Sequence, residues 1–159
     1  MTRFYLNDYL DVNTSVYKYK KKNAIKNIEV PTELYDLYFD DFLDSKNIVK
    51  IKNAFKNYND ISESHNELST LFLKEMNMLE TFATPFVNDV ADDETGFGAV
   101  GKSYCSSVES LWFRFAVLRN KKNKQFNHFN NSTQLYKKWS NRIKEYNLIQ
   151  SMNEINEKL

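Results

Sequence analysis

The sequence predicts a single domain over residues 1–159, mainly α-helical, whose short N-terminal β-hairpin would make the fold α+β. Five stretches repeat apolar residues at helical spacing, and two of them begin with a capping box. Only three glycines and two prolines interrupt the 159 residues, so regular structure is expected to fill most of the chain. The hairpin is expected within residues 1–30 and the helices within 31–159.

The spacing of apolar residues in the first part of the chain changes at Thr32, from the alternation of a strand to the spacing of a helix. Residues 16–20 (VYKYK) alternate apolar and polar side chains as a strand does, and residues 28–30 (IEV) could pair with them. Thr32 is suited to cap a helix that carries aromatic residues on one side and carboxylates on the other. A second helix is expected from Ser45, with lysines facing outward.

The next helix is expected to begin at a capping box, Ser64 to Glu67. Pro85, which is suited to a first helical position, is expected to open a further short helix, and residues 92–103 are expected to form a loop. The apolar stripe of the helix that follows the capping box consists of Leu68, Leu71, Phe72, Met76, Leu79 and Phe82.

A second capping box, Ser106 to Glu109, is expected to start the central helix, because the residues that follow are apolar on nearly all sides. Its stripe comprises Val108, Leu111, Trp112, Phe115 and Leu118. A long C-terminal helix is predicted up to about Glu157, with a stripe formed by Leu135, Trp139, Ile143 and Tyr146.

Charge is segregated along the chain although the net charge is only +1. Residues 29–44 hold six acids and no base, and residues 57–113 hold ten acids against two lysines, whereas residues 110–144 hold nine bases and no acid.

The single cysteine, Cys105, excludes an intrachain disulfide and fits a reducing compartment. No uncharged stretch approaches the ~18 residues of a membrane span, so a cytoplasmic location, without membrane contact, is expected.

Residues 96–103 (GFGAVGKS) match the pattern of a phosphate-binding loop, whose backbone amides cradle phosphates. The context argues against that function, because no buried strand precedes the glycines and residues 88–95 carry four acids. A mobile hinge or a contact loop with an exposed Phe97 is the preferred interpretation of this segment. A nucleotide-binding protein that uses the segment as a phosphate-binding loop is the third function considered.

No catalytic, cofactor-binding or metal-ligating residue is assigned, and no cofactor is expected. His65, His128 and Cys105 lie far apart and lack flanking motifs, so Cys105 is interpreted as a small buried hydrophobe. Glu75 and Arg119 fall within apolar stripes and are expected to form a structural ion pair.

The residues assigned to partner binding are mainly acidic. Spacings of three and four place Glu33, Asp36, Asp40 and Asp44 on one helix face at intervals of about 5–6 Å, close to the spacing of phosphates along a nucleic-acid strand. Such an acidic ridge could compete for a basic DNA-binding surface. Asp92, Asp93 and Phe97 complete the assigned set.

In length, composition and charge segregation the chain resembles phage and mobile-element anti-CRISPR proteins directed at the RNA-guided DNA nuclease of type II systems. The resemblance implies a non-enzymatic inhibitor that acts in the host bacterial cell and blocks DNA binding or cleavage by that nuclease or another nucleic-acid enzyme. These proteins share no motif, so the resemblance assigns no residue. The alternative is a small nucleic-acid-binding or phage-accessory protein that uses the basic segment 114–144, where aromatic residues are interleaved with bases.

Overall fold

The computed structural model describes residues 2–24, 65–112, 114–115 and 129–156. These ranges form a helical assembly without strands, which confirms the mainly α-helical class for this part of the chain. The helices are α1 (Thr2–Lys22), α5 (Asn66–Val87), α6 (Asp93–Ser110) and α8 (Asn130–Asn156).

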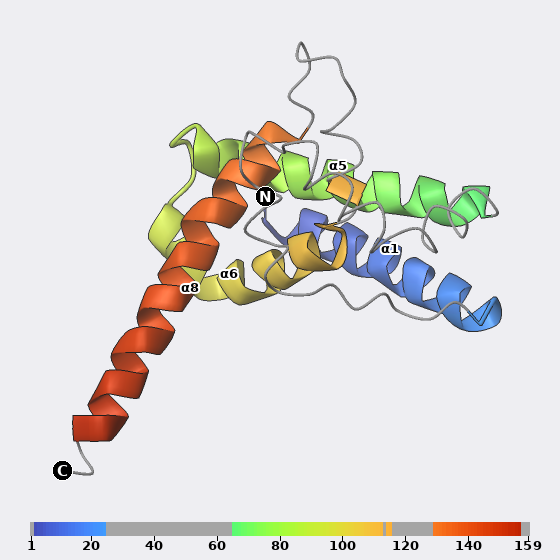
Figure 1. Ribbon diagram of the computed structural model, residues 1–159. Coiled ribbons are helices and arrows are strands. Elements are labelled where there is room, and N and C mark those ends of the chain that lie inside the picture. Colours follow the sequence, from blue (N-terminus) through green and yellow to red (C-terminus); the bar gives the residue numbers. More distant parts are fainter. Residues whose placement is uncertain (1, 25–64, 113, 116–128, 157–159) are drawn as a thin grey trace, which may run out of the picture.

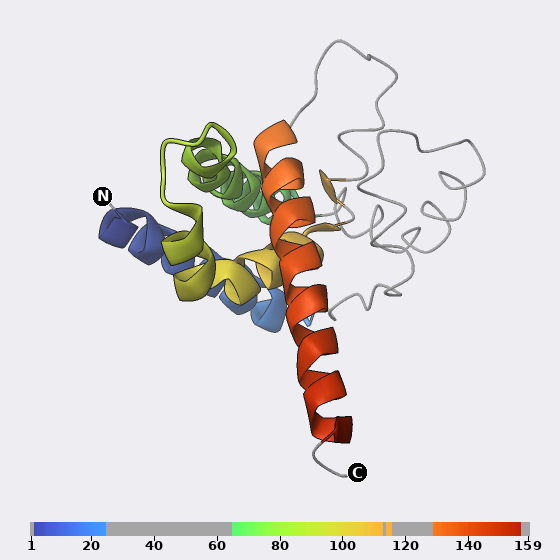
Figure 2. The same cartoon turned by 90° about the vertical axis from the view of Figure 1, so that its left-hand side faces the viewer.

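Helix α5 is central: α1, α6 and α8 each contact it. In Figure 1, α1 runs alongside α5, and α8 crosses the assembly and extends beyond it. Figure 2, turned by 90°, shows the same crossing of α8 over α5 and α6. This arrangement leaves one end of α8 outside the packed core.

The predicted N-terminal hairpin is wrong for residues 16–20, which lie within α1. Val12 and Val16, one helical turn apart, are the buried residues of this segment, whereas Tyr17 is 63% exposed. Five alternating residues are too few to separate a strand from one face of a helix. Residues 28–30 and the helices predicted from Thr32 and Ser45 lie outside the described ranges.

The apolar stripe of α5 is confirmed. Leu68, Phe72, Met76 and Leu79 are buried, and Leu71 and Phe82 pack against the same core. The helix begins after His65, which makes no side-chain capping hydrogen bond; Ser64 of the expected capping box lies outside the described residues.

The expected helix start at Pro85 is wrong, because α5 continues through this residue to Val87. Proline within a last turn removes one amide donor. The next residue, Phe86, is 8% exposed and lies with its ring centroid 5.2 Å from that of Trp139, so packing holds the turn in helical form.

The expected loop over residues 92–103 is also wrong, because Asp93–Ser110 forms α6. The predicted helix start at the capping box near Ser106 is wrong as well, because these residues lie in the last turns of α6, which ends at Ser110. Asp92 is the N-cap, and its side chain accepts hydrogen bonds from the backbone amides of Glu94 and Thr95. Glycine lowers helix propensity by about 1 kcal/mol relative to alanine, but tertiary packing overrides that cost here.

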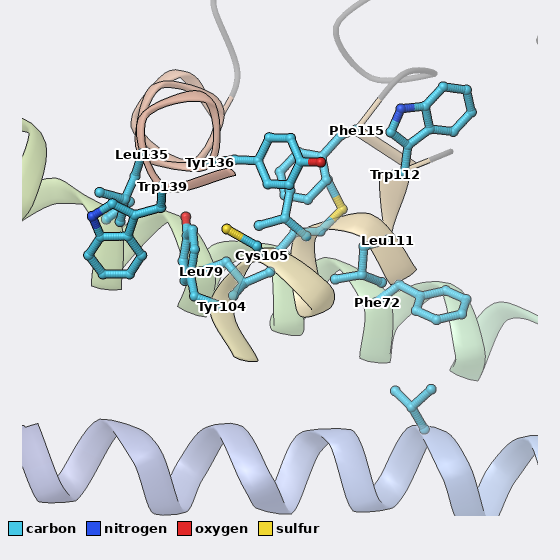
Figure 3. Packing of buried hydrophobic residues seen from close by; sticks show 14 of the residues in the cluster. Phe72, Leu79, Tyr104, Cys105, Leu111, Trp112, Phe115, Leu135, Tyr136 and Trp139 are labelled. Carbon is cyan, nitrogen blue, oxygen red and sulfur yellow. The ribbon is translucent and has the colours of Figure 1, made fainter. Parts of the chain in front are cut away.

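The predicted core aromatics are confirmed where they are described. Trp112, Phe115 and Trp139 are all fully buried. Figure 3 shows Trp139 and Trp112 at opposite ends of one cluster, with Tyr104, Cys105 and Leu111 among the side chains between them. Leu118 of the predicted stripe lies outside the described residues.

The start of α8 is fixed by a side chain from α5. The Glu80 carboxylate accepts hydrogen bonds from the backbone amides of Asn131 (3.1 Å) and Ser132 (2.7 Å), and also from the Ser132 hydroxyl (2.7 Å). A carboxylate at a helix N-terminus also complements the helix dipole. None of the helices in the described ranges is both long and apolar enough to cross a membrane.

Candidate functional site

The three predicted partner-binding residues that are described lie where α6 meets α8. Asp92 is exposed, but its carboxylate is engaged as the N-cap of α6 and also accepts a 2.6 Å hydrogen bond from the Thr95 hydroxyl. The hydrogen bonds from Thr95, followed by that from Glu94, outweigh desolvation and lower the pKa of Asp92. The Asp92 carboxylate therefore caps the N-terminus of α6.

Asp93 points toward α8. One carboxylate oxygen accepts a 2.9 Å hydrogen bond from Trp139 Nε1 and lies 3.0 Å from Lys138 Nζ, while the other lies 3.0 Å from Arg142 Nη1. Burial opposes ionisation of Asp93, but the hydrogen bonds from Trp139 and Lys138 and the neighbouring positive charges outweigh it. The pKa of Asp93 is consequently lowered.

Phe97 is half-buried rather than exposed as predicted. The centroid of its ring lies 5.9 Å from that of Trp139 and 4.0 Å from the Arg142 guanidinium. Arg142 also binds both oxygens of Glu94, at 3.0 and 2.8 Å. Phe97 and Asp93 therefore act first as internal contacts that hold α8 on α6.

The glycines of residues 96–103 are explained by close packing within α6. A Cβ on Gly96 would collide with the Phe86 ring, and a Cβ on Gly101 would collide with the Phe97 ring. Gly98 faces open space. Amides inside an α-helix bond to carbonyls four residues earlier, so this segment does not form the amide cradle that a phosphate-binding loop requires.

The described part of the basic segment is largely bound within the fold. Arg114 donates a 2.6 Å hydrogen bond to Ser69 Oγ and its guanidinium lies 5.5 Å from the centroid of the Phe72 ring. Lys138 and Arg142 bind Asp93 as described above. The bases at 119–124 lie outside the described residues.

A pocket that the sequence did not indicate lies between α1, α5 and α6. Its volume is about 270 Å³, and Lys20 and Glu75 contribute opposite charges to its lining beside Ser106, Ser107 and Ser110. Glu75 is only 3% exposed. Burial lowers the pKa of Lys20, against the opposing effect of the Glu75 charge. The volume lies just below that of typical ligand pockets, so it suits water or a small polar molecule.

Glu75 was expected to pair with Arg119, which lies outside the described residues. Its burial inside the α5 stripe is confirmed, and its charge acts on Lys20, whose pKa it raises against the larger effect of burial. The signal that was missed is the helical spacing of Val12, Val16 and Lys20, which places the lysine next to the buried face of α1.

Of the remaining predicted residues, Cys105 and His65 are described by the structure and the others are not. Cys105 is buried as expected, and burial raises the pKa of its thiol to about 12. His65 precedes α5, and its Nδ1 lies 3.1 Å from the Tyr19 hydroxyl. The acidic ridge (Glu33, Asp36, Asp40 and Asp44) and His128 lie outside the described ranges. Within those ranges no group of three His, Cys, Asp or Glu side chains could hold a metal ion.

Comparison with known proteins finds no matching family, no matching curated protein and no matching solved structure.

Proposed function

We propose that this protein is a non-enzymatic inhibitor that binds an RNA-guided DNA nuclease and blocks DNA binding or cleavage. The observation that supports this proposal is the charge at the turn between α5 and α6, the acidic turn, formed by Asp89, Asp92, Asp93 and Glu94. Two cations of α8 bind part of it: Lys138 and Arg142 bind Asp93, and Arg142 also binds Glu94, so the four carboxylates carry two more charges than these two cations.

The excess negative charge of the acidic turn is accessible. The Glu94 side chain is 82% exposed, and Asp89 and Asp92 are also exposed. Nucleases of this class hold their guide–target duplex in a positively charged channel. An acidic surface is complementary to such a channel and would compete with nucleic acid for it. The acidic ridge predicted from Glu33 to Asp44 lies outside the described residues and is proposed as a second acidic contact.

The alternative, direct nucleic-acid binding through the basic segment, receives less support. Phosphate binding needs cations that are free to displace counterions. Arg114, Lys138 and Arg142 are instead engaged with side chains of the same protein. The helical conformation of residues 96–103 argues against nucleotide binding by this segment.

A reconstituted cleavage assay tests the proposal. A type II effector loaded with guide RNA is titrated with the protein, and DNA binding and cleavage are measured separately. We expect inhibition that saturates near one equivalent and weakens as salt rises, because exposed charges are screened beyond about 8 Å at physiological ionic strength.

Two charge variants locate the surface. Asp89→Asn with Glu94→Gln neutralises the acidic turn while sparing the cap Asp92 and the internal ligand Asp93, and asparagine tolerates the positive φ of 55° at position 89. A second variant changes Glu33, Asp36, Asp40 and Asp44 to lysine. We expect both to weaken inhibition and the exposed Lys102→Ala to leave it unchanged.

Two results would contradict the proposal. One is unaltered cleavage with the protein in excess over the nuclease. The other is retention of DNA or RNA by the protein alone that is abolished by Lys121→Glu, Lys122→Glu and Lys124→Glu together, which would favour the nucleic-acid-binding alternative.

A further inference from the structure

The last turns of α1 carry a basic surface on the side away from the core. Val12 and Val16 are buried on one side of this helix. At about 100° per residue, four exposed residues lie away from these two valines. We call them the α1 basic face: Tyr17, Lys18, Lys21 and Lys22.

No acid within this part of α1 neutralises the α1 basic face. Residues 12–22 contain four lysines and no acid. The preceding Asp11 lies seven residues before Lys18. That spacing is about 10 Å along the helix axis and exceeds the screening length of about 8 Å at physiological ionic strength. Lysines at a helix C-terminus also complement the helix dipole, but exposed ammonium groups remain open to other anions.

The lysines of the α1 basic face differ from the cations that the fold uses internally. Arg114 and the two cations that bind the acidic turn are held by side chains of the same protein. Among the described residues, no side chain forms an ion pair or a hydrogen bond with Lys18, Lys21 or Lys22. Phosphates can therefore displace the counterions of these lysines, which is the main source of affinity for nucleic acids.

Tyr17 adds a flat aromatic surface to these charges. Its side chain is 63% exposed, and it is the one exposed apolar residue between Asp11 and Lys22. An exposed aromatic ring beside cations is the arrangement on which the bases of a single strand stack. A helix that binds a lipid surface needs a broad apolar face instead. A single-stranded nucleic acid is therefore the better complement to this surface.

The polar pocket between α1, α5 and α6 adjoins the α1 basic face at Tyr17, which lines it together with Asn13 and Ser106. Both of these polar residues are exposed. An amide and a hydroxyl can each donate and accept hydrogen bonds. A base held against Tyr17 would find partners for its polar edge there, and groups that both donate and accept do not select one base.

The α1 basic face and the acidic turn lie at opposite ends of α5. The Tyr19 hydroxyl lies 3.1 Å from Nδ1 of His65, which precedes α5, whereas the acidic turn follows Val87. The 22 residues of α5 separate these ends by about 33 Å. Figure 1 shows the end of α1 beside the start of α5, far from the turn between α5 and α6. The two charged surfaces therefore do not neutralise each other.

We propose that the α1 basic face binds single-stranded nucleic acid without sequence preference. A base stacks on Tyr17, and the lysines bind the neighbouring phosphates. The inference is independent of the proposed function, since it uses neither the acidic turn nor the acidic ridge.

Fluorescence anisotropy of the full chain with labelled oligo-deoxythymidine and oligo-uridine strands of about 15 nucleotides tests this inference. We expect saturable binding of both strands, with a dissociation constant on the order of 10 μM at about 50 mM salt. Three neutralised phosphates predict a slope of about −2 for log affinity against log salt, so a fourfold rise in salt should weaken binding about 16-fold.

Two lysine variants locate the surface. Lys18→Gln with Lys21→Gln should weaken binding at low salt about tenfold and reduce the slope to about −0.7. The matched control, Lys74→Gln with Lys102→Gln, removes the same charge from exposed positions on α5 and α6 and should bind as the parent does.

Two variants of Tyr17 separate stacking from charge. Tyr17→Leu should weaken binding about fivefold or more and leave the salt slope unchanged, because it removes the ring and no charge. Tyr17→Phe keeps the ring and should retain the affinity. All substituted residues are exposed, so circular dichroism and thermal melting should show folded proteins throughout.

Three results would overturn the proposal. One is a parent protein that binds neither strand at low salt. Another is an equal loss of binding in the two lysine variants, or in neither, since the strand would then respond to net charge or lie on another surface. The third is binding that Tyr17→Leu leaves intact, because charge alone would then hold any polyanion.

Discussion

Trp139 Nε1 in the middle of α8 donates a 2.9 Å hydrogen bond to Asp93 Oδ1 in the first turn of α6. Trp139 is fully buried and its ring contacts those of Phe82, Phe86 and Tyr104. A buried indole donor is costly to leave without an acceptor. The Asp93 carboxylate therefore supplies the hydrogen-bond acceptor that water supplies to an exposed tryptophan. This bond also fixes how α8 crosses α6.

Asp93→Ala should lower the free energy of unfolding by about 1–3 kcal/mol, because it leaves the buried Trp139 Nε1 without its acceptor. Glu94→Ala is the matched control: this neighbouring carboxylate also binds Arg142, but its side chain is 82% exposed, so the expected loss is below about 0.5 kcal/mol. Urea denaturation measures both. Equal losses in the two variants would contradict the role given to Asp93.

Acid should weaken the same contact. The pKa of Asp93 is lower in the folded chain than in the unfolded one, so its contribution is present at neutral pH and is lost as pH falls below about 4. We expect the parent to lose more stability than Asp93→Asn between about pH 5 and pH 2. Parallel slopes of stability against pH, measured by urea titration at each pH, would show that Asp93 is not coupled to folding.

Replacing Gly96 or Gly98 of α6 by alanine should change the stability of the protein in opposite directions. Gly96→Ala drives a methyl group into the Phe86 ring and should destabilise the protein by about 1–3 kcal/mol. Gly98→Ala faces open space and should stabilise it by up to about 1 kcal/mol through helix propensity. Thermal melts distinguish the two. If residues 96–103 were a mobile loop, neither substitution would change the melting temperature.

Cys105 should be unreactive in the folded protein. Its thiol is buried, and its pKa of about 12 leaves almost no thiolate at pH 8. We expect iodoacetamide to label it slowly in buffer and rapidly in denaturing urea, as followed by intact mass spectrometry. Fast labelling under native conditions would mean that the α6 region opens readily.

The helices that sequence patterns predicted well are those whose signal is local and repeated. The α5 stripe from Leu68 to Phe82 has a clear helical period, and Leu135 and Trp139 are buried as expected. Tyr146, placed on the same α8 stripe, is 54% exposed instead. Periodicity identifies a face, but it does not tell where the neighbouring helices end.

The errors at the candidate site arise from contacts between distant segments. Three glycines near four acids indicate a loop, and only the rings of Phe86 and Phe97 explain why glycine is required at two of those positions in a helix. Likewise Asp93 meets Trp139 across 46 residues. No spacing rule in one sequence connects such residues, so the contacts of Asp93 with α8 could not be predicted from the sequence.

The bond from Glu80 to the start of α8 has a consequence for the order in which the chain assembles. The amides that open α8 are satisfied by a carboxylate 51 and 52 residues earlier in the sequence. Starting a helix is the unfavourable step in its formation, and here that step is assisted only once a long stretch of chain has closed, at an entropic cost that grows slowly with its length. During synthesis α5 leaves the ribosome before α8. The carboxylate that assists the start of α8 is therefore already present when α8 forms.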